Sequence, residues 1–233
     1  MSIQLITFDL DDTLWEVAPV LENAETALRE WLLDAAPRIG TAGVEQLWRI
    51  RAELVATEPA LRHRISELRR RVLLRALCEA GYPEKQARTL AEQAFEVFLA
   101  ARHQVSLFPE VQPTLEVLAN RYQLAVLTNG NADVRRLGLA DYFRFALCAE
   151  ELGVGKPDPL PFREALRRAG VAAHQAVHVG DHPRDDIQGA REAGLRAVWY
   201  NPRGLPWQGK PEPDAQISRL DQLPQTLARW SAI

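Results

Sequence analysis

Short apolar runs and longer amphipathic stripes follow one another along the chain in a definite order. Residues 3–8 form a short, mostly apolar run with β-branched side chains that ends in carboxylates, which predicts a buried strand of a parallel sheet. The apolar residues that follow recur at the i, i+4, i+7 spacing of helices. Four helices are predicted there, one along the stripe at 20–35 and three near 44–56, 60–80 and 84–102. This block is expected to be an all-helical module.

From about residue 109 the pattern changes to short apolar strands that alternate with helices, which is typical of βαβ units and a parallel sheet. Four further strands are predicted, at 124–127, 145–148, 176–179 and 196–200. Pro and Gly residues mark 201–214 as a loop, and a last short strand and helix close the chain. The sequence therefore predicts an α/β fold with a helical module inserted after the first strand.

Polar residues with potential chemistry stand where the predicted strands end. In open α/β sheets, ligands bind outside the carboxyl ends of the strands, at the point where the strand order reverses. Residues from distant parts of the chain are therefore expected to converge on one crevice. The polar residues that follow three of the strands are Asp9, Asp11, Asp12, Thr128, Asn129, Gly130 and Asp181.

Three carboxylates in the segment FDLDDTLW carry like charges that are costly to hold together without a cation. Oxygen-rich sites of this kind suit Mg²⁺, which takes one or two carboxylates together with water and phosphate oxygens. Asp181 is a candidate for the second carboxylate. Taken alone, Asp9 and Asp11 are equally compatible with a turn and a helix cap, and Thr128, Asn129 and Gly130 alone are compatible with a simple turn.

Composition narrows the partners and the compartment. The net charge is −3, and the 47% hydrophobic and 25% charged residues are ordinary for a globular protein. Cys78 and Cys148 are far apart and outside any CxxC spacing, so a reducing cytoplasm is expected and zinc is not. No apolar run has the ~18 residues of a membrane span. The basic stretch at 62–71 lies on an amphipathic helix and is interpreted as a solvated face, not a nucleic-acid site. Contact with an anionic or polar substrate is the alternative for Arg62, His63, Arg64 or Arg69.

Four motifs in order, DLDDTL, TNG, GKPD and GDHPRDD, resemble those of the haloacid dehalogenase-like hydrolases. The resemblance spans almost the whole chain. It implies a Rossmann-like three-layer core, formed by 1–15 and 105–233, and an inserted helical class I cap at 16–104. It also implies a phosphatase that uses Mg²⁺ and hydrolyses a small-molecule phosphate monoester through a phospho-aspartate. No obligate protein partner is evident in the sequence.

The same resemblance implies roles for the first two motifs. Asp9 is expected to attack phosphorus, and Asp11 is expected to protonate the leaving oxygen and then to activate water. Thr128, with the neighbouring Asn129 and Gly130, is expected to hold the phosphate.

Roles for the last two motifs follow in the same way. Lys156 is expected to neutralise the charge of the nucleophile and of the phosphoryl group. Asp186 is expected to support Lys156 or a metal-bound water, with the adjacent Asp185 as the alternative. The Mg²⁺ ligands that the resemblance implies are the Asp9 carboxylate, the Asp11 main-chain carbonyl and the Asp181 carboxylate.

A narrower resemblance concerns the substrate. The segments TNGNA, HVGD and ISRLDQL are similar to those of the bacterial pyrimidine phosphatases of flavin biosynthesis, which implies 5-amino-6-(5-phospho-D-ribitylamino)uracil or FMN as substrate. A nucleotidase or sugar-phosphate phosphatase of the same family would carry the same core motifs. Because 2-haloacid dehalogenases lack a carboxylate two residues after the nucleophile, Asp11 argues against that activity. A non-catalytic binding module is expected to lose Asp9, Asp11, Lys156 or Asp181, and none is lost.

Overall fold

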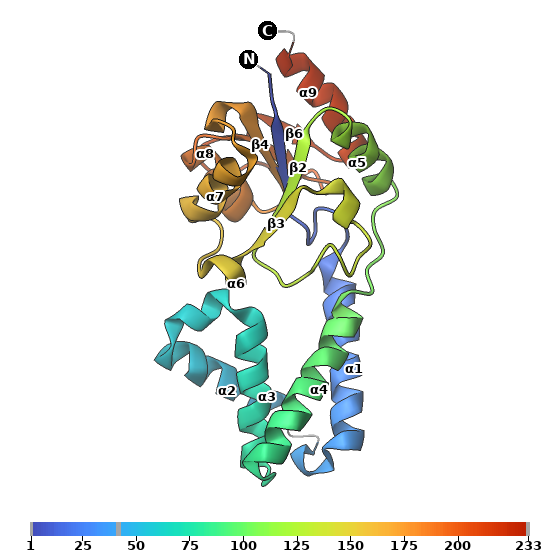
Figure 1. Cartoon of the computed structure of the whole chain (residues 1–233), viewed down its shortest axis with the longest axis vertical. Coiled ribbons are helices and arrows are strands. Elements are labelled where there is room, and N and C mark those ends of the chain that lie inside the picture. Colours follow the sequence, from blue (N-terminus) through green and yellow to red (C-terminus); the bar gives the residue numbers. More distant parts are fainter. Residues whose placement is uncertain (1, 41–42, 232–233) are drawn as a thin grey trace. The chain divides into compact units, whose positions relative to one another are not determined.

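The computed structural model describes residues 2–40 and 43–231. It divides into two compact units (Figure 1), which we call the α/β unit (Met1–Glu16 with Ser106–Ile233) and the helical unit (Val17–Val105). The assignment of these units to a catalytic core and a cap stays a prediction.

Six parallel strands form the sheet of the α/β unit, in the order β3-β2-β1-β4-β5-β6. The predicted parallel sheet is therefore confirmed. Leu5 of β1 is level with Gln123 of β2 and Ala176 of β4, so these three strands also end close to one level. The strand order reverses at the central β1, which makes its carboxyl end the topological switch point. The strands are β1 (Leu5–Phe8), β2 (Gln123–Thr128), β3 (Phe145–Cys148), β4 (Ala176–Gly180), β5 (Arg196–Tyr200) and β6 (Ala215–Ile217).

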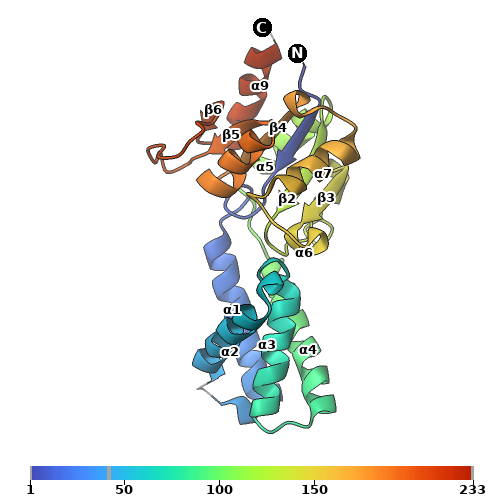
Figure 2. The ribbon, with the colours of Figure 1, turned by 90° about the vertical axis from the view of Figure 1, so that its left-hand side faces the viewer.

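Helices cover both faces of this sheet, which gives three layers (Figures 1 and 2). One side carries α5 (Val111–Ala119) and α9 (Leu223–Ser231), and the other carries α7 (Pro159–Ala169) and α8 (Gly189–Glu192). A short α6 (Ala149–Leu152) follows β3. Apolar side chains of the inner strands pack with those of α7, such as Phe162, in one core cluster. Burial of these apolar side chains makes the main favourable contribution to the folding free energy of the α/β unit. Short 3₁₀ helices lie at Ala140–Tyr142, Ala173–Gln175 and Leu220–Gln222.

The helical unit has its own apolar core. Its elements are α1 (Val17–Ala35), α2 (Gly43–Thr57), α3 (Ile65–Glu79) and α4 (Glu84–Arg102), with 3₁₀ turns at Pro37–Ile39 and Pro59–His63. The buried stripe of α1 packs with Phe95 and Phe98 of α4 in one cluster. In the described part of the chain, no helix combines the length and the apolar character needed to cross a membrane.

The predicted helix at 60–80 is wrong at one point, because the backbone breaks at Arg64 (φ −114°, ψ 63°). Leu61 lies before the break and Leu68 after it, yet both are buried in one small cluster. Their spacing of seven residues also fits a continuous helix, so the apolar pattern does not reveal the break.

The arginines of α3 are paired inside the helical unit. Arg69 donates to Glu25 at 2.7 Å, and its guanidinium lies 3.6 Å from the centre of the Phe98 ring. Arg70 pairs with Glu92 at 3.0 Å. Ion pairs and cation–π contacts of this kind belong to a solvated helix face.

Candidate active site

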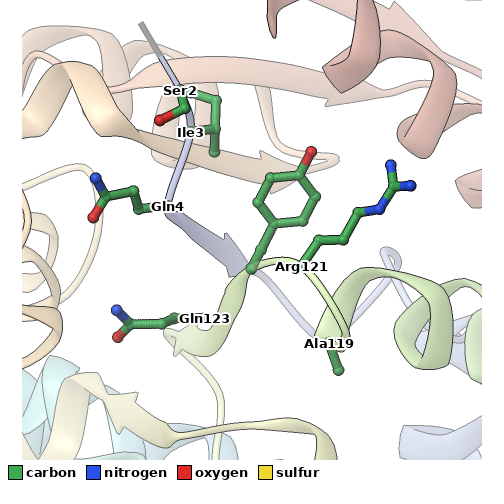
Figure 3. A pocket seen from close by; sticks show the side chains of 7 residues that line it. Ser2, Ile3, Gln4, Ala119, Arg121 and Gln123 are labelled. Carbon is green, nitrogen blue, oxygen red and sulfur yellow. The ribbon is translucent and has the colours of Figure 1, made fainter.

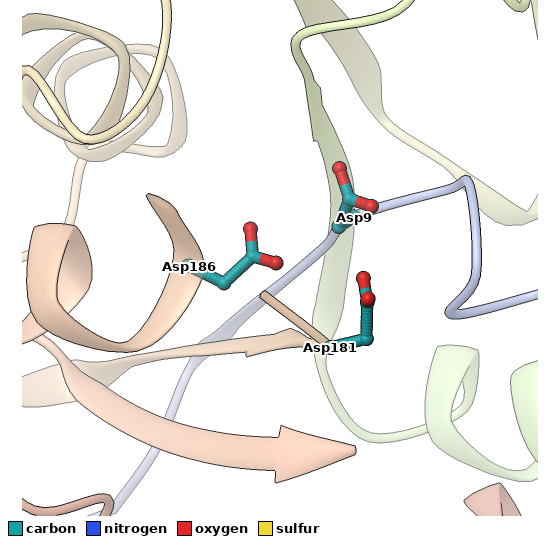
Figure 4. A group of neighbouring side chains, drawn as sticks. All are labelled: Asp9, Asp181 and Asp186. Carbon is teal, nitrogen blue, oxygen red and sulfur yellow. The ribbon is translucent and has the colours of Figure 1, made fainter. Parts of the chain in front are cut away.

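Three aspartates from two strand ends gather in the α/β unit. Asp9 follows β1, Asp181 follows β4, and Asp186 lies in a short π-helical segment, Pro183–Gln188. The Asp9 N–H donates to the Val179 carbonyl at 2.9 Å, which keeps Asp9 alongside the end of β4. Each aspartate offers a carboxylate oxygen within 4.8 Å of those of the other two (Figure 4). This concentration of negative charge requires cations nearby.

Lys156 supplies one of these positive charges. Its Nζ donates to Asp9 Oδ1 at 2.6 Å and to Asp186 Oδ1 at 2.5 Å, and only 3% of its side chain is exposed. Burial on its own would lower the pKa of Lys156, but the Asp186 and Asp9 carboxylates outweigh it and raise the pKa above the usual range. The ammonium therefore stays charged and joins the two aspartates.

Asp186 is the acidic residue that faces this lysine. Its Oδ1 also accepts from His178 Nε2 at 2.9 Å, and its Oδ2 accepts from the His182 N–H at 2.9 Å. Burial raises the pKa of Asp186, but Lys156 and His178 outweigh it and hold the pKa below the usual range. Asp185 is instead 32% exposed at its side chain. Of the two candidates, Asp186 is therefore the one placed beside Lys156.

Two glycines leave the room that this arrangement needs. A Cβ on Gly180 would lie 2.2 Å from Asp186 Cγ, and a Cβ on Gly155 would lie 2.5 Å from Asn129 Oδ1. Real Cβ contacts are never this short, so any other residue at either position would displace a site side chain. The glycines of the GKPD and GDHPRDD motifs thus serve close approach.

Asn129 holds the backbone of Lys156. Its Nδ2 donates to the Lys156 carbonyl at 2.9 Å, and its Oδ1 accepts from the Lys156 N–H at 2.8 Å. Both polar atoms of the amide are thereby engaged, which differs from the expected contact with phosphate. Thr128 is buried, and its Oγ1 accepts from the Gly130 N–H at 2.9 Å, which leaves the hydroxyl proton to be donated.

Asp11 lies in a tight turn after Asp9. Leu14 N donates to the Leu10 carbonyl at 2.8 Å across this turn, and Asp12 adopts a left-handed φ of 58°. The Asp11 Oδ1 accepts from Trp15 Nε1 at 3.0 Å. Trp15 is fully buried, and its indole N–H orients the Asp11 carboxyl group.

Asp181 is held through both its backbone and its side chain. Trp199 Nε1 donates to the Asp181 carbonyl at 2.8 Å, and Thr13 Oγ1 donates to Asp181 Oδ1 at 3.3 Å. Burial, with help from Asp186 and Asp12, raises the pKa of Asp181 from 3.8 to about 7. Burial also raises the pKa of Asp9 well above 3.8, although Lys156 opposes this effect. Both carboxyls thus favour an additional cation beside them.

The donor set fits Mg²⁺. Asp9 and Asp181 offer hard carboxylate oxygens, and the Asp11 carbonyl follows directly in the turn. Asp186 already accepts three hydrogen bonds, two of them from Lys156 and His178, so it serves as the counter-ion of the lysine.

A separate cavity of about 620 Å³ lies far from these groups, where the strands begin (Figure 3). Gln4 precedes β1 and Gln123 opens β2, so this cavity is at the amino ends of parallel strands and not at the switch point. None of its lining residues is acidic, which makes it unsuitable as the metal site. They are Ser2, Ile3, Gln4, Ala119, Arg121, Tyr122 and Gln123.

Sequence reasoning brings the main groups to one place but misses several that orient them. Thr13 belongs to the first motif and Trp15 follows it directly, so the proximity of Trp15 to Asp11 was detectable. His178 and Trp199 carry no comparable signal, because each lies in an apolar strand and meets its partner only through the order of the strands. The roles predicted for the motif residues stay predictions.

Fold and site together define an α/β enzyme with its chemical groups at the switch point of a parallel sheet. A family model described as haloacid dehalogenase-like hydrolase matches residues 3–194. The chain belongs to this family and is a hydrolase, as the motifs predict.

Three proteins illustrate the range of its relatives. The 5-amino-6-(5-phospho-D-ribitylamino)uracil phosphatase YigB of Escherichia coli (strain K12) is 32% identical, over 95% of this chain and 94% of its own. The phosphoserine phosphatase of Thermus thermophilus is 37% identical, over 95% of this chain and 98% of its own. The structure of a 2-haloacid dehalogenase from Pseudomonas syringae pv. Tomato DC3000 is 64% identical, with a TM-score of 0.97 over 98% of this chain and 99% of that one. Phosphatases and a protein described as a dehalogenase are thus both similar to it.

Proposed function

We propose that this hydrolase is a Mg²⁺-dependent phosphatase that cleaves a small-molecule phosphate monoester through a phosphorylated Asp9. The observation that carries the proposal is the pair of carboxylates, Asp9 and Asp11, at the switch point, with Lys156 bonded to the first of them. Phosphoryl transfer depends mainly on positioning and on neutralising charge around the equatorial oxygens. A buried ammonium beside the attacking group supplies part of that neutralisation.

Asp9 is the nucleophile in this proposal. Its Oδ1 is held by Lys156 at 2.6 Å, which leaves Oδ2 to form the bond to phosphorus while the ester oxygen departs. Bound by Asp9, Asp181 and the Asp11 carbonyl, Mg²⁺ would supply positive charge to the phosphoryl oxygens. The Thr128 hydroxyl and the Gly130 region are the proposed phosphate contacts.

Asp11 is the proposed general acid and base. The Trp15 indole N–H donates to Asp11 Oδ1 at 3.0 Å and orients the carboxyl group, which in this proposal protonates the leaving oxygen. Ionised by that step, the same carboxylate then accepts a proton from the water that attacks the phosphorus of phospho-Asp9. Asn129 acts indirectly, by fixing the backbone that carries Lys156.

The proposed substrate class is a small phosphorylated metabolite, and the ribitylaminouracil phosphate is the first candidate. YigB, whose printed activity is on this compound, is similar over 95% of this chain. In a phosphate-release assay of this protein, we expect kcat/KM for the ribitylaminouracil phosphate to exceed kcat/KM for phosphoserine, FMN and common sugar phosphates. Equal or poorer use of the ribitylaminouracil ester would remove this substrate and leave the phosphatase proposal in place.

Dehalogenation is the second candidate, because the 64% identical structure is described as a 2-haloacid dehalogenase. Asp11 favours the phosphatase, since displacement of a halide needs no acid to protonate the leaving group. Parallel assays of phosphate release and of halide release from 2-haloacids, with Mg²⁺ and with chelator, separate the two activities. We expect Mg²⁺-dependent phosphate release and no halide; halide release that persists in chelator would overturn the proposal.

We further infer that the protein works in the cytoplasm, with the phosphate ester as its partner and without nucleic acid or membrane. Cys78 and Cys148, both in the described part of the chain, are free thiols. Free thiols are the common state of cysteine in a reducing compartment.

A further inference from the structure

A fully buried histidine lies directly behind the lysine and aspartate of the site. His178 of β4 is level with Thr7 of β1, and both side chains are 0% exposed. Nδ1 of the imidazole lies 2.8 Å from Thr7 Oγ1, and Nε2 lies 2.9 Å from Asp186 Oδ1. Phe162 of α7 packs edge-on against the ring, with 5.3 Å between centroids. The ring is therefore held on three sides.

The hydrogen bonds fix which nitrogen carries the proton. Asp186 is ionised beside Lys156, so a lone pair on Nε2 would face a negative oxygen at 2.9 Å. Nε2 must therefore carry the hydrogen. Desolvation lowers the pKa of His178, so the ring is neutral and its Nδ1 is an acceptor. The Thr7 hydroxyl then donates to Nδ1 at 2.8 Å, in preference to the Val177 carbonyl at 3.3 Å.

We propose that His178 is a positioning residue for Lys156: its Nε2–H holds Asp186 Oδ1 where that oxygen binds the ammonium, and Thr7 selects the imidazole tautomer that allows it. A continuous series of contacts then runs from Thr7 through His178, Asp186 and Lys156 to Asp9. Asp9 has the most exposed side chain of the five residues, at 12%, and Thr7 and His178 are fully buried. Water therefore does not easily replace a hydrogen bond that is lost in this series.

One oxygen of Asp186 is fixed by the backbone, but the carboxylate still needs a second contact to hold the other oxygen. Its Cγ lies where a Cβ on Gly180 would be 2.2 Å away, and its Oδ2 is already fixed by the His182 N–H. Rotation about that second bond would move Oδ1 away from Lys156. The imidazole N–H opposes this rotation together with the Lys156 ammonium, and through Lys156 it orients the Asp9 carboxylate.

Kinetics of matched variants test the proposal, and this part rests on the proposed phosphatase function. His178→Leu removes the N–H, whereas His178→Gln places an amide N–H near the position of Nε2. We expect His178→Leu to lower kcat for phosphate release by about 10- to 100-fold with KM within about threefold, because an orienting residue is lost. His178→Gln should recover most of the loss. Phe162→Leu, which changes packing on the ring and in the core but removes no hydrogen bond of the ring, should keep kcat close to wild type per folded molecule.

Thr7→Val provides a second variant that keeps the buried shape if His178→Leu does not fold. It removes the hydroxyl that donates to His178 Nδ1. We therefore expect a smaller loss of kcat than in His178→Leu, and a change in the tautomer or charge of the imidazole. Long-range ¹H–¹⁵N NMR reports that state directly, with the His178→Gln spectrum identifying the signal. The wild-type ring should be neutral with its proton on Nε2.

The two readouts separate the possible failures. If wild-type protein releases no phosphate, the proposed function fails while the tautomer measurement still decides the state assigned to His178. A proton on Nδ1 would overturn the inference. So would unchanged kcat in His178→Leu, or a His178→Gln variant as slow as His178→Leu, since either result removes the role assigned to the N–H.

Discussion

Asp9, Asp11 and Asp181 are chemically identical side chains in three different environments. Asp9 is buried against Lys156, Asp11 is half-buried and accepts from the Trp15 indole, and Asp181 accepts from the Thr13 hydroxyl. Environments that separate the protonation behaviour of like groups allow one site to hold a nucleophile, an acid and a metal ligand. The roles proposed for the three residues follow from these surroundings.

Asp11→Asn should remove proton transfer while keeping the acceptor for Trp15 and the main-chain carbonyl. Loss of a general acid or base typically costs about a hundredfold to ten-thousandfold in rate. We expect losses of this size for alkyl phosphates, which need protonation of the leaving oxygen, and smaller losses for activated aryl phosphates.

Asp12→Asn is the matched control for this change, because asparagine tolerates the left-handed φ of 58° at that position. Steady-state phosphate release from both ester types should be near wild type in this variant. Full activity of Asp11→Asn on alkyl phosphates would show that another carboxylate, such as Asp12, carries out the proton transfer.

Asp181 makes folding stability depend on pH when no metal is present. Burial raises its pKa to about 7 from 3.8. Between these values the folded protein holds a proton that the unfolded chain has released, so the Asp181 contribution lowers stability as pH rises through this window.

Asp181→Asn should remove that dependence. In chelator we expect it to be more stable than wild type near pH 8, and the advantage to shrink towards pH 5. One pKa unit corresponds to about 1.4 kcal/mol, and the partial exposure of the group reduces this, so the gain should be about 1 to 3 kcal/mol. Urea denaturation of both proteins measures it. An advantage that is equal at both pH values would contradict the raised pKa.

At the scale of elements, the loop after α6 is joined to the end of β2 by one amide. Asn129 exchanges two hydrogen bonds with the backbone of Lys156, over a separation of 27 residues. The packing of the Asn129 amide on Gly155 makes this junction compact. The position of the ammonium therefore depends on a residue that need not touch the substrate.

Asn129→Ala removes both bonds, whereas Asn129→Asp keeps the acceptor for the Lys156 N–H and loses the donor. We expect Asn129→Ala to lower kcat by about 10- to 100-fold, with Asn129→Asp in between, by analogy with other orienting residues. The loss of two partly buried hydrogen bonds should also cost about 1 to 3 kcal/mol of unfolding free energy. If kcat is unchanged while stability falls, the amide has a purely structural role.

The strands and most helices were predictable because apolar runs and stripes mark them directly. The contacts within the site were less predictable. Asp9 and Lys156 follow from the motifs, but the pairing of His178 with Thr7 depends on β1 and β4 being neighbours. The helix break at Arg64 was hidden for another reason, since a seven-residue apolar spacing fits both a continuous and an interrupted helix.

For the whole molecule, the proposed function requires an anionic ester to bind at a site built from aspartates in a chain of net charge −3. Lys156 balances part of this charge, and the raised pKa values of Asp9 and Asp181 indicate that more is needed. A divalent cation would complete the balance, which is why we expect chelation to stop phosphate release. Relatives described as phosphatases and as a dehalogenase are both similar to this chain, so the framework does not decide the chemistry, and the proposed phosphatase activity depends on phosphorylation of Asp9.

Rapid-quench peptide mapping tests that claim most directly. Wild-type protein and Asp11→Asn, mixed with Mg²⁺ and an activated aryl phosphate that the protein turns over, should each yield a phosphorylated peptide containing Asp9. More of it should form in Asp11→Asn, because an aryl leaving group needs little protonation while the hydrolysis of the intermediate is slowed. The phosphorylated peptide should be absent from Asp9→Asn and from samples with chelator. Phosphate release without phosphorylation of Asp9, or by Asp9→Asn at all, would contradict the account.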